Sequence, residues 1–116
     1  MAEKKVLISF NHPPYGSIFY TEGLRAAVGT IAGIDEHRVN VVFLGDGVYF
    51  CLKDVDRSDT FKYLNTLSQA GTKLFAEEES LNARNISNDK LADDVEVITR
   101  KKVLELYKDT DFNIDF

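Results

Sequence analysis

The sequence predicts a single α/β domain with a parallel sheet over residues 1–116. Short apolar runs alternate with segments of helical periodicity, which is typical of parallel strands joined by helices. The run Val39–Leu44 (VNVVFL) is apolar enough for a strand that is covered on both faces. A length of 116 residues fits one domain of ordinary size, and no internal repeat divides it.

Five segments have the residue pattern of strands. In chain order they are Lys5–Phe10, Val39–Leu44, Lys73–Ala76, Val95–Ile98 and Phe112–Phe116. In the last segment apolar and polar residues alternate, so we expect one wetter face and a place at the edge of the sheet.

Helical patterns fill the intervals between the strands. The expected helices are Ser17–Gly33, Asp46–Val55, a segment from a cap at Ser58 or Asp59 to Gly71, Glu78–Arg84, and a last helix capped by Thr99. In four of these helices, apolar residues at helical spacing should face the core. They are Tyr20, Leu24, Ala27, Val28 and Ile31 in the first helix; Val48, Cys51, Leu52 and Val55 in the second; Phe61, Leu64 and Leu67 in the third; and Val103, Leu104 and Tyr107 in the last. We expect Gly71 and Asn85 to end helices, because both residue types tolerate left-handed backbone.

Composition restricts the possible functions. Fourteen Lys and Arg against 19 Asp and Glu give a net charge of −5, which argues against direct nucleic-acid binding. No apolar run approaches the roughly 20 residues of a membrane span, and the N-terminus does not resemble a signal peptide. A single cysteine cannot form an intrachain disulfide or a cysteine-based metal site. We therefore expect a cytoplasmic protein without membrane contact, metal or cofactor.

The loop after the first strand, NHPPYGS, is the first candidate site. A phosphate cradle is disfavoured, because the loop has one glycine and two prolines that donate no backbone hydrogen bond. In the plainest interpretation the prolines stiffen a turn before the helix. Ligands of open α/β sheets, however, meet the carboxyl ends of the strands. The residues expected there as ligand- or partner-binding groups are Asn11, His12, Tyr15, Gly16, Asp46, Glu77, Glu78 and Ser80.

Several segments follow one another in a distinctive order: NHPPYGSIFYTEGLRAA, VVFLGDGVYFCL, KYLNTLSQAGTKLFAEEESLNARNI and DFNIDF. They contain Pro14, Gly16, Glu22–Leu24, Asp46–Val48 and Asp111–Phe116. Over nearly the whole chain this order resembles the DsrE/DsrF/DsrH family, most closely its DsrF or TusC branch. The resemblance implies a three-layer α/β/α fold with a mainly parallel five-stranded sheet.

The resemblance also implies intracellular sulfur chemistry. Proteins of this family pass persulfide sulfur between cysteines, toward thiouridine in tRNA in the TusBCD complex or in sulfur oxidation in DsrEFH. They assemble as homo-oligomers or with DsrE- and DsrH-like subunits, and sulfur-carrier proteins are possible partners. DsrE- and TusD-type subunits carry the active cysteine just after the third strand, where this chain has Glu77-Glu78-Glu79-Ser80. The departure favours a non-catalytic or scaffolding subunit of a sulfur relay.

Cys51 is the only thiol that could replace the missing one. It shares the apolar stripe of the helix expected at Asp46–Val55, so we favour a buried, unreactive side chain. The alternatives are a sulfurtransferase that uses Cys51 and a small-ligand module at the strand carboxyl ends. Tyr49 and Phe50 lie off that stripe, which predicts an oligomer contact or rings that cover a loop of their own chain.

Overall fold

The computed structural model describes residues 4–13, 19–32, 37–55 and 57–116. One five-stranded sheet has the order β4-β3-β2-β1-β5, and every neighbouring pair is parallel. The strands are β1 (Lys5–Phe10), β2 (Arg38–Phe43), β3 (Leu74–Glu77), β4 (Val95–Ile98) and β5 (Phe112–Asp115). The predicted parallel sheet is confirmed, with the bounds of β2 and β3 shifted by one residue and β5 ending one residue earlier than expected.

In the residues that the structure describes, four α-helices and three short 3-10 helices connect the strands. The α-helices are α1 (Phe19–Ala32), α2 (Phe61–Gln69), α3 (Glu78–Ala83) and α4 (Arg100–Asp109); the 3-10 helices are η1 (Gly45–Cys51), η2 (Ser58–Thr60) and η3 (Asn88–Lys90). None of the helices in the described ranges is long and apolar enough to cross a membrane.

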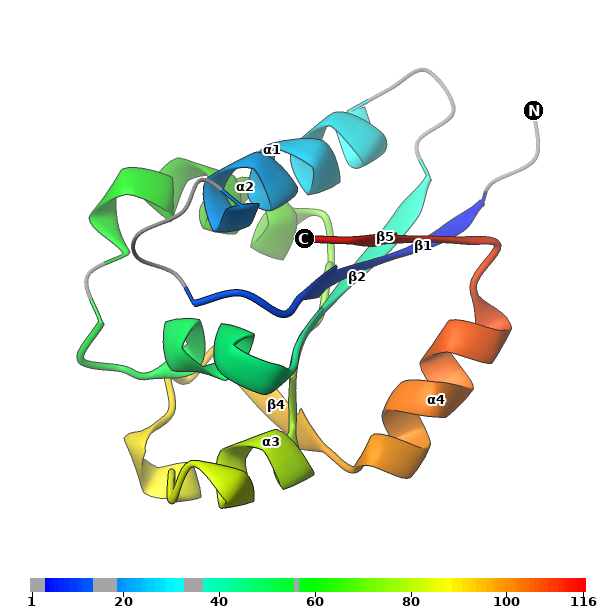
Figure 1. The fold of residues 1–116 in the computed structure, drawn as a ribbon. Coiled ribbons are helices and arrows are strands. Elements are labelled where there is room, and N and C mark those ends of the chain that lie inside the picture. Colours follow the sequence, from blue (N-terminus) through cyan, green and yellow to red (C-terminus); the bar gives the residue numbers. More distant parts are fainter. Residues whose placement is uncertain (1–3, 14–18, 33–36, 56) are drawn as a thin grey trace.

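The alternation of side chains along the strands divides the core into two layers. On one face Ile8 and Phe10 pack with Leu24 of α1 and Leu67 of α2. On the other face Leu7, Val42 and Phe75 pack against Val103 of α4. Figure 1 shows α1 and α2 together on one side of the sheet and α4 on the other. The three-layer α/β/α fold is thus confirmed.

The helix ends follow simple backbone chemistry. Thr99 caps α4 as predicted, since its side chain accepts a hydrogen bond from the backbone N–H of Lys102. Gly71 (φ 82°) and Asn85 (φ 55°) take left-handed backbone after α2 and α3. The predicted cap at Ser58 or Asp59 is wrong, because Ser58 starts η2 and Thr60 precedes α2 without a side-chain cap.

The segment after β2 differs from the predicted helix Asp46–Val55. It is the 3-10 helix η1, which ends at Cys51, and Leu52 then forms an antiparallel bridge with Leu91. Three residues per turn align Gly47 with Phe50, and both are buried. The expectation that Phe50 faces outward is therefore wrong, since the ring is 2% exposed and lies against the ring of Phe43. Tyr49 is 38% exposed.

Four further apolar residues are more exposed than expected. Phe61, which begins α2, is 64% exposed, and Leu104 is 57% exposed because α4 turns Val103 toward the sheet instead. β5 is the predicted edge strand, but neither of its faces is dry: its four residues are all exposed. Phe112 and Ile114 remain in contact with solvent, because no other strand in the described part of the chain lies beyond β5.

Candidate functional site

The carboxyl ends of β1, β2, β3 and β4 meet at one edge of the sheet, because the strands are parallel. The backbone N–H of Leu44 donates to the carbonyl of Phe10, which brings the segment after β2 beside the end of β1. Gly45 (φ 56°) then turns close to the carbonyl oxygen of Asn11. The segments that contain Asn11, Asp46 and Ser80 thus lie together at the strand ends, with Gly45 bonded to Ser80, while their binding role stays a prediction. Tyr15 and Gly16 lie outside the described residues.

Glu77 is the central group of this edge. It is the last residue of β3, and its side chain, on the α4 face of the sheet, is 5% exposed. The Oε1 atom accepts a hydrogen bond from Ser80 Oγ at 2.6 Å and one from Arg100 Nη2 at 3.0 Å. Oε2 accepts from Arg100 Nε at 3.3 Å, so the guanidinium holds both carboxylate oxygens.

These contacts determine the charge of Glu77. Burial raises the pKa of the carboxyl, but the hydrogen bonds from Arg100 and Ser80 and the charges of Arg100 and Arg84 lower it more. The pKa of Glu77 therefore lies below its ordinary value, and the group is ionised at neutral pH. The same hydrogen bond and ion pair raise the pKa of Arg100.

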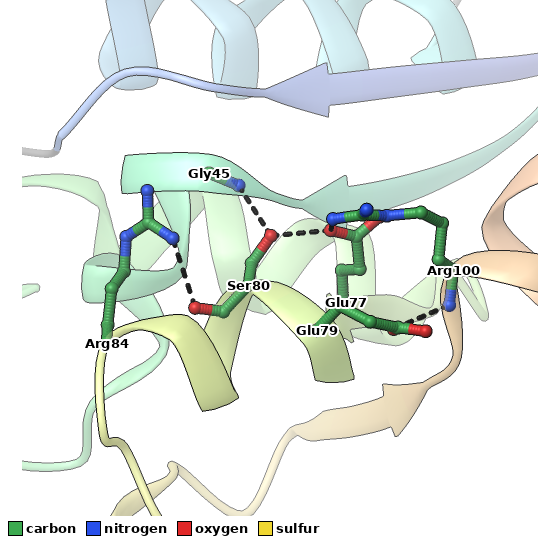
Figure 2. Close-up of polar contacts among 6 residues, drawn as sticks. All are labelled: Gly45, Glu77, Glu79, Ser80, Arg84 and Arg100. Carbon is green, nitrogen blue, oxygen red and sulfur yellow. Dashed lines mark hydrogen bonds and ion pairs between the residues drawn. The ribbon is translucent and has the colours of Figure 1, made fainter.

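The side chain of Ser80, in α3, bonds to the segment that follows β2. Its Oγ donates to Glu77 and accepts the backbone N–H of Gly45 at 2.9 Å (Figure 2). The hydroxyl is 4% exposed and uses both a donor and an acceptor position. One small side chain thus ties the turn after β2 to the end of β3.

Two arginines fasten the surrounding segments. Arg84, near the end of α3, donates through Nε and Nη2 to Asp46 Oδ1 at 3.1 and 2.9 Å, and through Nη1 to the carbonyl of Ser80. The backbone N–H of Arg100 donates to Glu79 Oε1 at 2.8 Å, which joins the start of α4 to α3 (Figure 2). The segments after β2, β3 and β4 therefore form one connected polar network.

Several acidic and polar side chains around the network stay exposed to solvent. The side chain of Asp46 is 54% exposed, and Asn11, His12 and Glu78 are exposed as well. Among the described residues, no group of three or more His, Cys, Asp or Glu could hold a metal ion. The site contains no thiol, and its buried carboxylate is committed to Arg100.

Cys51 lies inside the protein, away from this surface. The residue is 0% exposed and belongs to the core on the α1 face. Burial raises the pKa of its thiol well above the ordinary value, although the charge of Arg57 acts in the opposite direction. The prediction of a buried Cys51 is confirmed, and the thiolate that sulfur transfer requires is suppressed at neutral pH.

Sequence reasoning missed Arg84 and Arg100. Arg84 lies four residues after Ser80, at helical spacing, and Arg100 follows the end of β4. The rule that located the other site residues, which looks just past the strand ends, could have identified Arg100. Assigning its partner additionally requires knowing that β4 lies beside β3.

A cavity of about 630 Å³ lies at the opposite edge of the sheet. It is lined at the starts of β2 and β3 by residues that include Arg38, Asn40 and Lys73. None of the residues predicted for the carboxyl-end site contributes to it. The predicted site is therefore a surface above a polar network, distinct from the large hollow.

Comparison with solved structures supports the fold. The ychN protein from E. coli matches with a TM-score of 0.83 and 20% identity, over 99% of this chain and 100% of that one. MTH1491 from Methanobacterium thermoautotrophicum, a protein of unknown function, matches with a TM-score of 0.75 and 17% identity, over 98% and 100%. BT1422 from Bacteroides thetaiotaomicron, also of unknown function, matches with a TM-score of 0.68 and 12% identity, over 97% and 95%.

The sequence itself gives the more specific result. A search of curated proteins gives no significant match. The profile of the DsrE/DsrF-like family matches residues 4–116, which is nearly the whole chain and includes every element of the sheet. The match indicates a role related to sulfur relay. The chain belongs to the DsrE/DsrF-like family.

Proposed function

We propose that this protein is a non-catalytic subunit of an intracellular sulfur relay, as in the DsrF/TusC branch that its sequence resembles. It acts as a scaffold for partners that carry the sulfur-bearing cysteine, either DsrE- and DsrH-like subunits or sulfur-carrier proteins. In this role its carboxyl-end surface, around Asn11, His12, Asp46 and Glu78, is the docking face. Tyr15 and Gly16 belong to the same proposed face by sequence.

One observation carries the proposal. The end of β3 and the start of α3, where the resemblance places a sulfur-carrying cysteine, are occupied by Glu77 and by Glu78, Glu79 and Ser80. Glu77 is held by Ser80 and Arg100 rather than presented to solvent. A fixed anion at this point also repels hydrosulfide and persulfide anions, which would oppose sulfur transfer at the same place. Cys51, the chain's single thiol, is enclosed in the core.

The test of the non-catalytic role is sulfur loading. The folded protein is incubated with inorganic polysulfide, and the intact mass is measured. We expect no added sulfur on native protein, and one added sulfur when the same incubation is made in denaturant, which exposes Cys51. The denatured sample shows that the reagent is competent. A persulfide that maps to Cys51 of folded protein would contradict the proposal and favour a sulfurtransferase.

The docking role has a separate test. Binding to a DsrE-like subunit that carries a cysteine after its third strand is measured by titration calorimetry. Asp46→Lys with Glu78→Lys should weaken the binding at least tenfold, because both side chains lie on the exposed acidic surface. The matched control is Glu96→Lys with Glu105→Lys, which makes the same change in net charge at exposed carboxylates of β4 and α4. Equal weakening by the control would show that only net charge matters.

A further inference from the structure

The outer edge of β5 is the second notable surface. β5 is the terminal strand of the sheet, and beyond it no other strand of the described chain follows. Phe112 and Ile114 are 57% and 42% exposed, although they are the large apolar side chains of the strand. Their register opposite Val6 and Ile8 places both on the α1 face of the sheet. The strand contains neither proline nor lysine, the residues that commonly protect edges from pairing.

The other edge of the sheet is different. β4 has an exposed glutamate, Glu96, at its second position, and its apolar residues Val95, Val97 and Ile98 are buried or half-buried. Exposed charge on an edge strand disfavours pairing with another chain, but β5 also has an exposed charge, Asp115, so the two edges differ in their apolar side chains instead. Of the two edges, β5 alone combines unpaired backbone with exposed large apolar side chains.

We propose that β5 pairs antiparallel with β5 of a second copy, around a two-fold axis at Ile114, so that the two sheets become continuous. A two-fold axis perpendicular to the sheet keeps each face on its own side, so opposite residues must share a face. Among the registers that satisfy this rule, two pair three residues of β5 with three residues of its copy. One centres on Asn113 and the other on Ile114.

The polar residues distinguish the two registers. Centring on Asn113 places Asp111 opposite the partner's Asp115, a like-charge pair that destabilises a sheet. Centring on Ile114 places Asn113 opposite the partner's Asp115, where an amide N–H can donate to a carboxylate. On the other face it pairs Ile114 with itself and Phe112 with the partner's Phe116. The second register is apolar on one face and complementary on the other.

The contacts of Asp115 within the subunit prepare it for this pairing. Its Oδ1 accepts hydrogen bonds from Ser9 Oγ and Tyr107 Oη, which hold the carboxylate on the α4 face. A carboxylate has about four acceptor positions, so Oδ2 can accept an added donor. A second copy of β5 therefore makes apolar contacts on the α1 face and a hydrogen bond between Asn113 and Asp115 on the α4 face. An unrelated strand would satisfy both only by coincidence.

The first experiment measures size by sedimentation velocity across micromolar concentrations. We expect wild-type protein to form dimers or larger assemblies that contain this dimer, and Ile114→Lys to shift the midpoint of association at least tenfold in concentration. Phe61→Lys is the matched control, because Phe61 is more exposed but lies on α2. Circular dichroism checks that both variants fold. A wild-type monomer at every concentration would overturn the proposal, as would equal effects of the two variants.

The second experiment tests the register. In Ile114→Cys the two new thiols face each other across the axis, at a Cβ separation of about 4.5–5.5 Å, close to the reach of a disulfide. Mild oxidation should therefore crosslink this variant. Phe112→Cys faces the partner's Phe116 and should crosslink much more slowly, and Cys51 is too buried to compete. Equally fast crosslinking of both cysteine variants would refute the register. Neither experiment involves sulfur transfer, so failure here leaves the proposed function untouched.

Discussion

Replacing Glu77 by glutamine tests the centre of the polar network. The substitution keeps the length and shape of the side chain and removes its charge. In the wild type the carboxylate accepts hydrogen bonds from Ser80 and, through both oxygens, from Arg100. Glutamine has one carbonyl oxygen, so it can serve only part of these donors, and its NH₂ group must face a donor. The variant therefore loses hydrogen bonds at a position that is 4% exposed.

The size of the loss follows from the surroundings of Glu77. A hydrogen bond to a charged group contributes about 1.5–3 kcal/mol, and breaking a fully buried ion pair costs about 3–5 kcal/mol. Here the Arg100 side chain is 59% exposed, so water can solvate it once the carboxylate is gone. The lower range applies, and we expect Glu77→Gln to lower the free energy of unfolding by about 2 kcal/mol at pH 7.

The pH dependence of this stability difference distinguishes the loss of charge at Glu77 from a change in packing. The pKa of Glu77 is lower in the folded protein than its ordinary value of 4.5. Its contribution to stability is then fully present above the unfolded pKa and is lost as the pH falls through the folded pKa. The difference in unfolding free energy between wild type and Glu77→Gln should therefore be constant near neutrality and shrink below about pH 4.5.

Urea unfolding followed by circular dichroism at several pH values measures this difference. Glu78→Gln is the matched control, because Glu78 is the adjacent residue and is exposed. We expect it to change the free energy of unfolding by less than about 0.5 kcal/mol. A difference for Glu77→Gln that persists unchanged into acid would refute the electrostatic reasoning and leave only a packing effect.

Four other substitutions should change the free energy of unfolding, which is measured by urea unfolding. Gly47→Ala should cost about 3 kcal/mol or prevent folding, since a Cβ there would lie 2.0 Å from the carbonyl oxygen of Phe10; near-wild-type stability would show that η1 can move. Gly29→Ala, where nothing lies within 4 Å of a Cβ, should instead gain about 1 kcal/mol in α1, and a loss would contradict the helical assignment. Thr99→Ala should cost about 1 kcal/mol by removing the cap of α4, with Thr99→Ser restoring it. Cys51→Ala should cost about 1 kcal/mol; no change in midpoint would argue against tight packing around the thiol.

The strands were predictable because their signal is local. A parallel strand that is buried on both faces is a short apolar run, and Val39–Leu44 shows this pattern without any knowledge of the neighbouring strands. The caps were partly predictable for the same reason. Thr99 caps α4 with its own side chain, and Asn85 ends α3 through its left-handed backbone, so both effects are local. Ser58 caps no helix, because the chain there turns as a 3-10 helix.

The segment after β2 was mispredicted because two helical periods fit its sequence. Val48, Cys51 and Leu52 fall at helical spacing, which favours an α-helix from sequence alone. The distinction lies in a tertiary contact, since Gly47 packs directly against the backbone of Phe10 and the chain tightens to three residues per turn. This change of period moves Phe50 from the predicted surface into the core.

The position of the site was predictable from the sequence, but its residues and their ion pairs were predictable only in part. The rule that strand carboxyl ends meet located Asp46, Glu77 and Ser80 correctly. It could not show that the ionised Glu77 is paired with Arg100. That residue is 23 positions away in the sequence, and the strand order brings it beside Glu77.

Pairing of the first strand with the last has a consequence during synthesis. Lys5 and Asp111 form a hydrogen bond across 106 residues of sequence, and among the described strands β5 alone lies on that side of β1. At 5–20 residues per second, the ribosome needs roughly 5 to 20 s to complete β5 after β1 has emerged. Throughout that interval one edge of β1 is open, while β2, β3 and β4 can assemble on the other. A finished β5 from a neighbouring polypeptide fits the same open edge, so crowded translation of this protein should favour strand exchange between nascent chains.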